Sequence, residues 1–130
     1  MNLTYDQKIE LLGLMKHWVV ATQSDNTTND EYMIIDNKSS EQYSLGNPYE
    51  LVEMIEDLRS LLYEKDYKGF DRYISRKDND GSRKEFSYYL NLLFDNMVYQ
   101  VNNTFQKNHS KYKALHLNFV DFLEKLPKTK

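Results

Sequence analysis

The chain has no cysteine and little glycine or proline: four glycines and two prolines among 130 residues. Without cysteine it can form neither a disulfide framework nor a cysteine-ligated zinc site, and it has no thiol nucleophile. The glycines (Gly13, Gly46, Gly69 and Gly81) are scattered instead of being gathered in one phosphate-binding loop. The sequence therefore argues against disulfide-stabilised, zinc-ribbon and P-loop folds.

Long apolar runs are also missing. No segment approaches the roughly 18 consecutive apolar residues that span a bilayer, and the first residues lack the basic-then-apolar layout of a signal peptide. We therefore expect a cytoplasmic protein without a membrane partner. The length is typical of one domain, so we predict a single domain over residues 1–130 that ends in a basic tail at 127–130.

Charge divides the sequence into two halves. Residues 1–64 carry four basic and twelve acidic side chains, whereas residues 65–130 carry thirteen basic and eight acidic ones. The net charge of −3 therefore combines −8 in the first half with +5 in the second. Such asymmetry indicates either halves that attract each other, within one molecule or between two copies, or surfaces that face partners of opposite charge. Monomer and homodimer both remain open.

Apolar residues recur at helical spacing in four segments, and they predict main helices at about 5–21, 48–63, 83–106 and 111–125. Thr4 and Gln7 have the spacing of a capping box at the start of the first helix. Asn47 can cap a second helix that begins at Pro48, a residue favoured in the first helical turn.

The third predicted helix is the longest, and Ser82 and Glu85 have capping-box spacing before it. At 1.5 Å per residue it would be roughly 36 Å long, so we expect the other helices to pack along it as a central element. Before it, the pattern predicts a loop at 23–30, a β-hairpin at about 32–45, and a short helix broken near Gly69. The predicted fold class is α+β, predominantly helical.

Residues that could carry catalysis are sparse. The three histidines, His17, His109 and His116, lack a metal-ligand spacing, and no cofactor is predicted. Asp36 and Lys38 form a D-x-K sequence like that of magnesium-dependent nucleases, in which carboxylates hold the ion and the lysine steadies the attacking water. Because the nuclease core needs a larger sheet than one hairpin, we interpret the chain as non-enzymatic and keep a nuclease as an alternative.

A basic and aromatic segment follows the second predicted helix. Its side chains can neutralise phosphates and stack on bases, as nucleic-acid binding requires. The candidate contacts are Lys65, Lys68, Arg72, Tyr73, Arg76, Lys77, Arg83 and Lys84. Four aspartates lie in the same stretch and reduce the balance of its seven basic side chains to +3, so a salt-bridged surface is the competing interpretation.

Carboxylates gather in the first half of the chain. The candidate partner-binding residues are Asp30, Glu31, Glu50, Glu53, Asp57 and Glu64. An acidic surface can occupy a basic groove on another protein, with aromatic side chains as anchors. Eleven tyrosines are many for this length, and the predicted apolar stripes do not accommodate all of Tyr32, Tyr88, Tyr99 and Tyr112. These tyrosines are either anchors or covers for the edge of a small core.

The lack of catalytic motifs, the small size, the charge asymmetry and the abundant tyrosine together favour a protein-binding factor that covers a partner's surface. The partner would be another protein, such as a host nuclease or a nucleic-acid-binding protein. The high content of Asn, Lys, Ile and Tyr is typical of AT-rich bacterial and phage genomes, so we interpret the chain as a small inhibitor, anti-defence (anti-CRISPR-type) or immunity protein of a mobile element. The alternative is a nucleic-acid-binding accessory or regulatory protein that uses residues 65–84.

Overall fold

The computed structural model describes residues 3–36, 39–77, 84–103 and 112–126. These residues form the helices α1 (Tyr5–Asn26), α2 (Pro48–Tyr63), α3 (Tyr67–Ile74), α4 (Phe86–Asn102) and α6 (Lys113–Lys125), and the strands β1 (Thr27–Thr28), β2 (Glu31–Ile35) and β3 (Gln42–Ser44). The predicted fold class, α+β and predominantly helical, is confirmed. The predicted basic tail lies outside the described residues.

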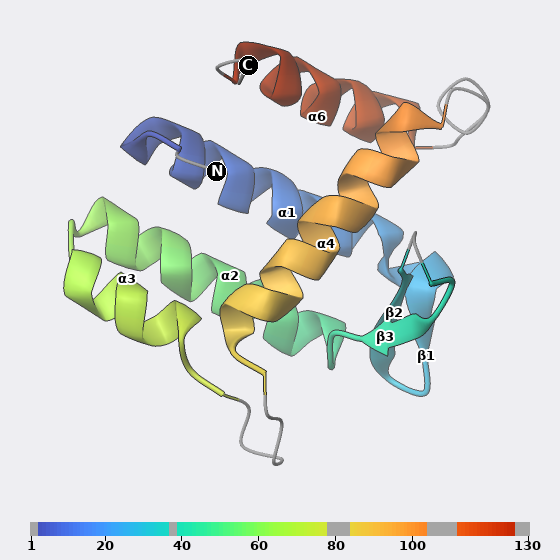
Figure 1. Cartoon of the computed structure of the whole chain (residues 1–130), viewed down its shortest axis with the longest axis horizontal. Helices are drawn as coiled ribbons and strands as arrows, with labels where there is room; N and C mark the ends of the chain where they lie inside the picture. The colour runs from blue at the N-terminus through green and yellow to red at the C-terminus, as the bar shows by residue number, and fades with distance from the viewer. Residues whose placement is uncertain (1–2, 37–38, 78–83, 104–111, 127–130) are drawn as a thin grey trace.

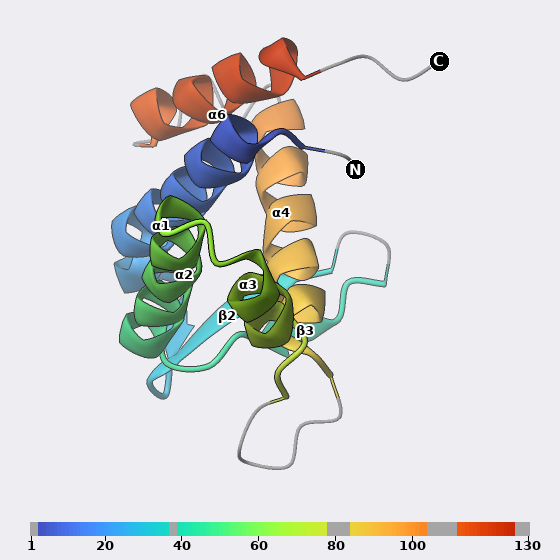
Figure 2. The same ribbon diagram turned by 90° about the vertical axis from the view of Figure 1, so that its left-hand side faces the viewer.

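The helices form two groups, and a small sheet lies at one end of them (Figure 1). α1 and α2 lie side by side and run in opposite directions, and α3 packs beside α2 (Figure 1, Figure 2). α4 is inclined steeply to them and contacts α3, β2 and α6, while α6 also packs against α1. The strands form one antiparallel sheet in the order β1-β2-β3 at the end of α1. Within the described part of the chain, no helix is both long and apolar enough to cross a membrane.

α1 begins where the sequence predicts. Thr4 Oγ1 accepts a hydrogen bond from the Gln7 N–H (3.1 Å), and the Thr4 N–H donates to Gln7 Oε1 (2.9 Å), so the predicted capping box is present. The helix then continues to Asn26, beyond the predicted end at 21.

The extension of α1 follows from a buried hydroxyl that needs partners. Tyr32 is fully buried, and its hydroxyl lies 2.6 Å from Thr22 Oγ1. Thr22 donates its single hydroxyl proton to Trp18 O (2.7 Å), so Tyr32 must donate to Thr22. Asn26 Nδ2 donates to the Tyr32 hydroxyl at 3.5 Å. Thr22 and Asn26 therefore belong to the inner face of α1, and Tyr32, a candidate surface anchor in the sequence, belongs to the core.

β1 follows α1 without a loop, because Thr27 is both the C-cap of the helix and the first strand residue. Thr28 pairs with Glu31, and the two residues between them, Asn29 and Asp30, have φ values of 53° and 63°. A two-residue loop with both φ angles positive is a type I′ turn, which matches the twist of the strands it joins. The loop predicted for this stretch is therefore wrong. The predicted hairpin corresponds to β2 and β3.

α2 starts with the predicted cap. Asn47 Oδ1 accepts hydrogen bonds from the N–H groups of Tyr49 (2.9 Å) and Glu50 (3.3 Å), and Pro48 occupies the first turn. The Tyr32 N–H donates to Gly46 O (2.8 Å), directly before this cap. The start of α2 is therefore attached to the central strand of the sheet.

α2 ends in a left-handed residue that is not glycine. Lys65 has a φ of 59°, its N–H donates to Leu62 O (3.0 Å), and the Asp66 N–H donates to Leu61 O (2.9 Å). This pair of bonds is a Schellman motif, which normally places glycine at the left-handed position. The motif turns the chain directly into α3.

α3 is continuous through Gly69, so the break predicted near this residue is wrong. Asp66 caps the helix, and its Oδ1 accepts a hydrogen bond from the Gly69 N–H (2.9 Å). A Cβ atom at position 69 would lie 2.3 Å from Asp66 Oδ2. The glycine therefore leaves room for the capping carboxylate instead of interrupting the helix.

α4 is shorter than predicted. It begins at Phe86, because Glu85 is extended and forms a β-bridge with Lys77, and the Phe86 N–H donates to Arg76 O (2.9 Å). Asn103 ends the helix with a non-helical ψ of 96°. The predicted boundary at 83 and the last predicted residues, 104–106, lie outside the described residues. Seventeen residues give a length of about 25 Å, so α1, with 22 residues, is the longest described helix.

One apolar core joins all five described helices and the sheet. Where α1 packs against α6, the Trp18 ring stacks on the buried His116 ring, with centroids 5.1 Å apart, and meets the edge of Phe119. This aromatic cluster joins α1 to α6. The fully buried side chains of the core include Val19, Tyr32, Ile55, Leu58, Leu62, Leu93, Met97, Val101, Phe119 and Phe122.

Candidate protein-binding surface

Four of the predicted partner-binding carboxylates lie on one exposed stripe of α2. Glu50, Glu53 and Asp57 are exposed helix residues, and Glu64 is the exposed C-cap. At about 100° per residue these four positions fall within a sector of roughly 60°, and they extend over about 21 Å of the helix axis. We call Glu50, Glu53, Asp57 and Glu64 the acidic stripe.

A fifth acid of α2 lies off the stripe and is paired. Glu56 Oε1 is 3.1 Å from Lys16 Nζ and 2.5 Å from Arg59 Nη1. Desolvation opposes ionisation of Glu56, but the two basic neighbours outweigh it and lower the pKa of the carboxyl group. Lys16 and Arg59 therefore form ion pairs with Glu56 on the side of α2 that faces α1. Within the described residues, no basic side chain forms an ion pair with the acidic stripe.

Exposed tyrosines lie at both ends of the stripe. Tyr49 at the start of α2 is 69% exposed, Tyr63 at its end is 58% exposed, and Tyr67 at the start of α3 is 53% exposed. The pKa of Tyr5 is raised by partial desolvation and then by Tyr67, Asp6 and Tyr63, which indicates that these tyrosines are near one another. The start of α1, the end of α2 and the start of α3 meet here (Figure 1). These tyrosines are not among the site residues predicted from the sequence, although Tyr49 and Tyr63 directly precede stripe carboxylates.

Asp57 joins the acidic stripe to α3. The Tyr73 hydroxyl donates to Asp57 Oδ2 at 2.9 Å. Burial, followed by this hydrogen bond and the charge of Asp57, raises the pKa of Tyr73 to about 12. The Tyr73 ring also meets the edge of Phe86 and lies under the Arg76 guanidinium, 5.0 Å from its centroid. Tyr73, a candidate for stacking on bases, therefore has its hydroxyl and its ring engaged within the fold.

The two remaining predicted carboxylates lie in the first hairpin. Asp30 is in the type I′ turn, and Glu31 is the first residue of β2. Both are exposed, and Glu31 Oε1 accepts a hydrogen bond from Ser44 Oγ (2.9 Å). Because the neighbouring strand residue Tyr32 is bonded to Gly46 just before α2, Glu31 lies near the N-terminal end of that helix.

The candidate nucleic-acid contacts are divided among several environments. Lys65, Lys68 and Arg72 are exposed at the start and on the outer face of α3, and none of them pairs with a carboxylate within the described residues. Lys77 is held in the bridge before α4, and Lys84 Nζ lies 4.9 Å from the centroid of the Tyr88 ring. Arg83 lies outside the described residues, and Tyr73 and Arg76 stack on each other. The structure thus brings together only part of this set.

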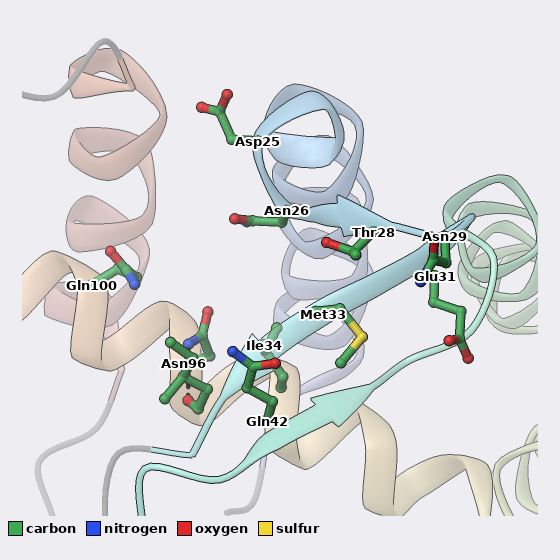
Figure 3. Close-up of a pocket in the computed structure, with 11 residues that line it drawn as sticks. Asp25, Asn26, Thr28, Asn29, Glu31, Met33, Ile34, Gln42, Asn96 and Gln100 are labelled. Atoms are coloured by element: carbon green, nitrogen blue, oxygen red, sulfur yellow. Dashed lines mark hydrogen bonds between the residues drawn. The ribbon is translucent and has the colours of Figure 1, made fainter.

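A polar groove opens where α1, the sheet and α4 meet (Figure 3). It has a volume of about 370 Å³. Its described lining residues are Asp25, Asn26, Thr28, Asn29, Glu31, Met33, Ile34, Ile35, Gln42, Asn96 and Gln100. Except for Glu31, none of these residues is among the site residues predicted from the sequence. The polar pair Asn96 and Gln100, four residues apart within the apolar pattern of α4, is the sequence signal that could have indicated it.

The D-x-K sequence of the nuclease alternative lies only partly within the described residues. Asp36 follows β2, whereas Lys38 lies outside the described residues. No group of three histidine or carboxylate side chains suited to a metal ion occurs among the residues that the structure describes. The chain matches no protein-family model, no curated protein and no solved structure.

Proposed function

We propose that the chain is a non-enzymatic binding protein that covers a basic surface of another protein with the acidic stripe of α2. The observation that supports this most strongly is the composition of one helix face: four exposed carboxylates, without basic partners among the described residues, with exposed Tyr49 and Tyr63 at the two ends. Interfaces commonly combine aromatic anchors with charges that complement the partner.

Physical chemistry assigns separate tasks to the two kinds of side chain. The carboxylates accelerate and orient the encounter with a basic surface, and this effect weakens as salt is added. The tyrosines supply apolar area at low entropic cost once the surfaces are in contact. The stripe presents four negative charges over about 21 Å of the helix, so a basic groove that binds a nucleic-acid backbone would offer it opposite charge. A protein that occupies such a groove acts as an inhibitor, which is the role of anti-defence and immunity proteins.

Charge reversal of the stripe tests the proposal. The double variant Glu50→Lys/Glu53→Lys leaves the Asp57–Tyr73 hydrogen bond in place, and Asp121→Lys/Glu124→Lys on α6 makes the same change in net charge on another exposed surface. Tagged wild type and both variants are used to capture proteins from a nuclease-treated lysate of a low-GC bacterium. Proteins held by the wild type and the α6 variant but lost by the α2 variant would be the partners.

Kinetics with the purified partner complete the test. We expect the α2 variant to associate at least tenfold more slowly at low salt, and its association rate to depend less on salt than that of the wild type. The α6 variant should resemble the wild type. Capture of the same proteins by all three forms, or equal association rates, would contradict the proposed role of the acidic stripe.

Nucleic-acid binding is the second candidate, because the exposed Lys65, Lys68 and Arg72 lie close together on and beside α3. If this surface binds nucleic acid, the fluorescence anisotropy of a labelled single-stranded oligonucleotide should report an affinity that falls steeply with salt. Lys68→Glu/Arg72→Glu should weaken that affinity at all sequences. No binding at low salt, or a flat salt profile, would exclude this candidate.

A further inference from the structure

The polar groove between α1, the sheet and α4 has one electrostatic sign. Among its described lining residues the two charged side chains, Asp25 and Glu31, are both carboxylates. Five others are carboxamides: Asn26, Asn29, Gln42, Asn96 and Gln100. Carboxamides offer oxygen acceptors as well as N–H donors, so the charge of the groove selects for a cation and against phosphate or carboxylate.

Internal hydrogen bonds hold two carboxamides of the groove in place. Asn96 is buried, and its Nδ2 donates to Ile35 O at 3.4 Å. Asn26 Nδ2 similarly donates to the buried hydroxyl of Tyr32 at 3.5 Å. Each bond uses one of the two N–H donors of the amide, so each side chain keeps its oxygen acceptor and one further N–H donor. In Figure 3 Asn26, Asn96 and Gln42 surround the same open space.

The floor of the groove is apolar and comes from β2. Met33 is partly buried and lies in the middle of the groove, and Ile35, which also lines it, is 52% exposed. Thr28 lies on the neighbouring strand β1. The groove thus combines a polarizable, apolar floor with a rim of acceptors.

We propose that this groove receives the guanidinium group of an arginine from the basic partner of the acidic stripe. A guanidinium is planar, carries five N–H donors and no acceptor, and is weakly hydrated, so it can lie on Met33 while it donates to the surrounding oxygens. A lysine ammonium is compact and strongly hydrated, and it presents fewer donors in one plane. This inference rests on the proposed function, because it names a residue of the same partner.

Glu31 places the groove next to the proposed interface. It lines the groove, and it also lies near the start of α2, where the acidic stripe begins. An arginine in the groove would therefore be adjacent to basic residues that face the stripe. Arginine is also enriched among the residues that dominate binding energy in protein interfaces.

The test uses a small probe in place of the partner. The full chain, labelled with ¹⁵N, is titrated with N-acetyl-arginine amide, and the side-chain amide signals of Asn26, Gln42 and Asn96 are followed by NMR. We expect saturable shifts with a dissociation constant on the order of millimolar, since one side chain supplies few contacts. N-acetyl-citrulline amide, which has the same shape without the charge, should bind at least tenfold more weakly, and N-acetyl-lysine amide should bind less tightly than the arginine probe.

A matched pair of variants locates the probe. Gln42→Lys adds a positive charge at an exposed groove residue and should abolish the shifts, whereas Asn118→Lys adds the same charge on α6 and should leave them unchanged. Absence of shifts with the arginine probe, or equal affinity for the citrulline probe, would overturn the inference. The titration contains no partner, so its failure would not bear on the acidic stripe. Conversely, failure of the charge-reversal experiment would contradict the acidic stripe and would not change the result of the arginine titration.

Discussion

Replacement of Lys65 by glycine should stabilise the protein, because Lys65 holds the left-handed position of the Schellman motif after α2 with a φ of 59°. A residue with a Cβ pays roughly 1–2 kcal/mol in this conformation. Glycine removes that strain, but it loses more conformational freedom on folding, which destabilises the folded state by roughly 0.5–1 kcal/mol. The net gain is therefore about 0.5–1 kcal/mol, which corresponds to a melting temperature about 2–5 °C higher for a domain of this size.

Urea and thermal unfolding of three forms separate the backbone effect from the charge. Lys65→Ala removes the same charge as Lys65→Gly but keeps a Cβ in the left-handed region, so the alanine variant should remain close to the wild type. The diagnostic quantity is the difference between the glycine and alanine variants, about 1 kcal/mol in favour of glycine. If both variants have the same free energy of unfolding, or if glycine is the less stable, α2 does not end in the motif described above.

Two further predictions concern tyrosine hydroxyls. Thr22→Val leaves the buried hydroxyl of Tyr32 without its acceptor and should lower the free energy of unfolding by about 1–3 kcal/mol. Adding Tyr32→Phe should recover part of that loss. If the destabilisation of the double variant equals the sum of the two single variants, the hydrogen bond is contradicted. The pKa of Tyr73, raised by burial and then by Asp57 to about 12, exceeds its ordinary value of 10.0, so its contribution to stability is present below pH 10 and is lost as pH rises toward 12. In an ultraviolet titration of tyrosine ionisation, Asp57→Asn should move the latest phase to lower pH, and an unchanged latest phase would contradict the contact.

The parts of the fold that local sequence determines were predictable. The cap of α1 depends on Thr4 and Gln7, three residues apart, and the cap of α2 depends on Asn47 and its immediate neighbours, so both starts were predicted correctly. The start of α4 could not be predicted in the same way. Glu85 is held extended by pairing with Lys77, a contact that the capping-box pattern does not contain.

The end of α1 shows a different limit of sequence patterns. Thr22 and Asn26 are polar, and polarity predicts a loop, but both face inward because the buried hydroxyl of Tyr32 requires hydrogen-bond partners. Their role depends on a residue that follows in the next hairpin. A pattern that classifies each residue as apolar or polar cannot represent a polar residue that is buried to satisfy another one.

The candidate surfaces were predictable to different degrees. The acidic stripe follows from helical spacing alone once α2 is placed, so the sequence could indicate all four carboxylates. The polar groove could not be derived in this way, because its lining comes from α1, all three strands and α4. Nothing in the spacing of Asn26, Gln42 and Asn96 indicates that these three side chains meet.

The direct passage from α1 into β1 also bears on the order of folding. The hydrogen bond between Thr22 and Tyr32 joins residues ten positions apart, and a chain segment of that length closes in roughly 10–100 ns. The type I′ turn lies inside this segment, so the helix end, the turn and the buried hydroxyl can assemble without any distant part of the chain. We expect this segment to be a nucleus onto which α4 and α6 later dock, and pulsed hydrogen exchange during refolding should then protect the β1–β2 amides before those of α6.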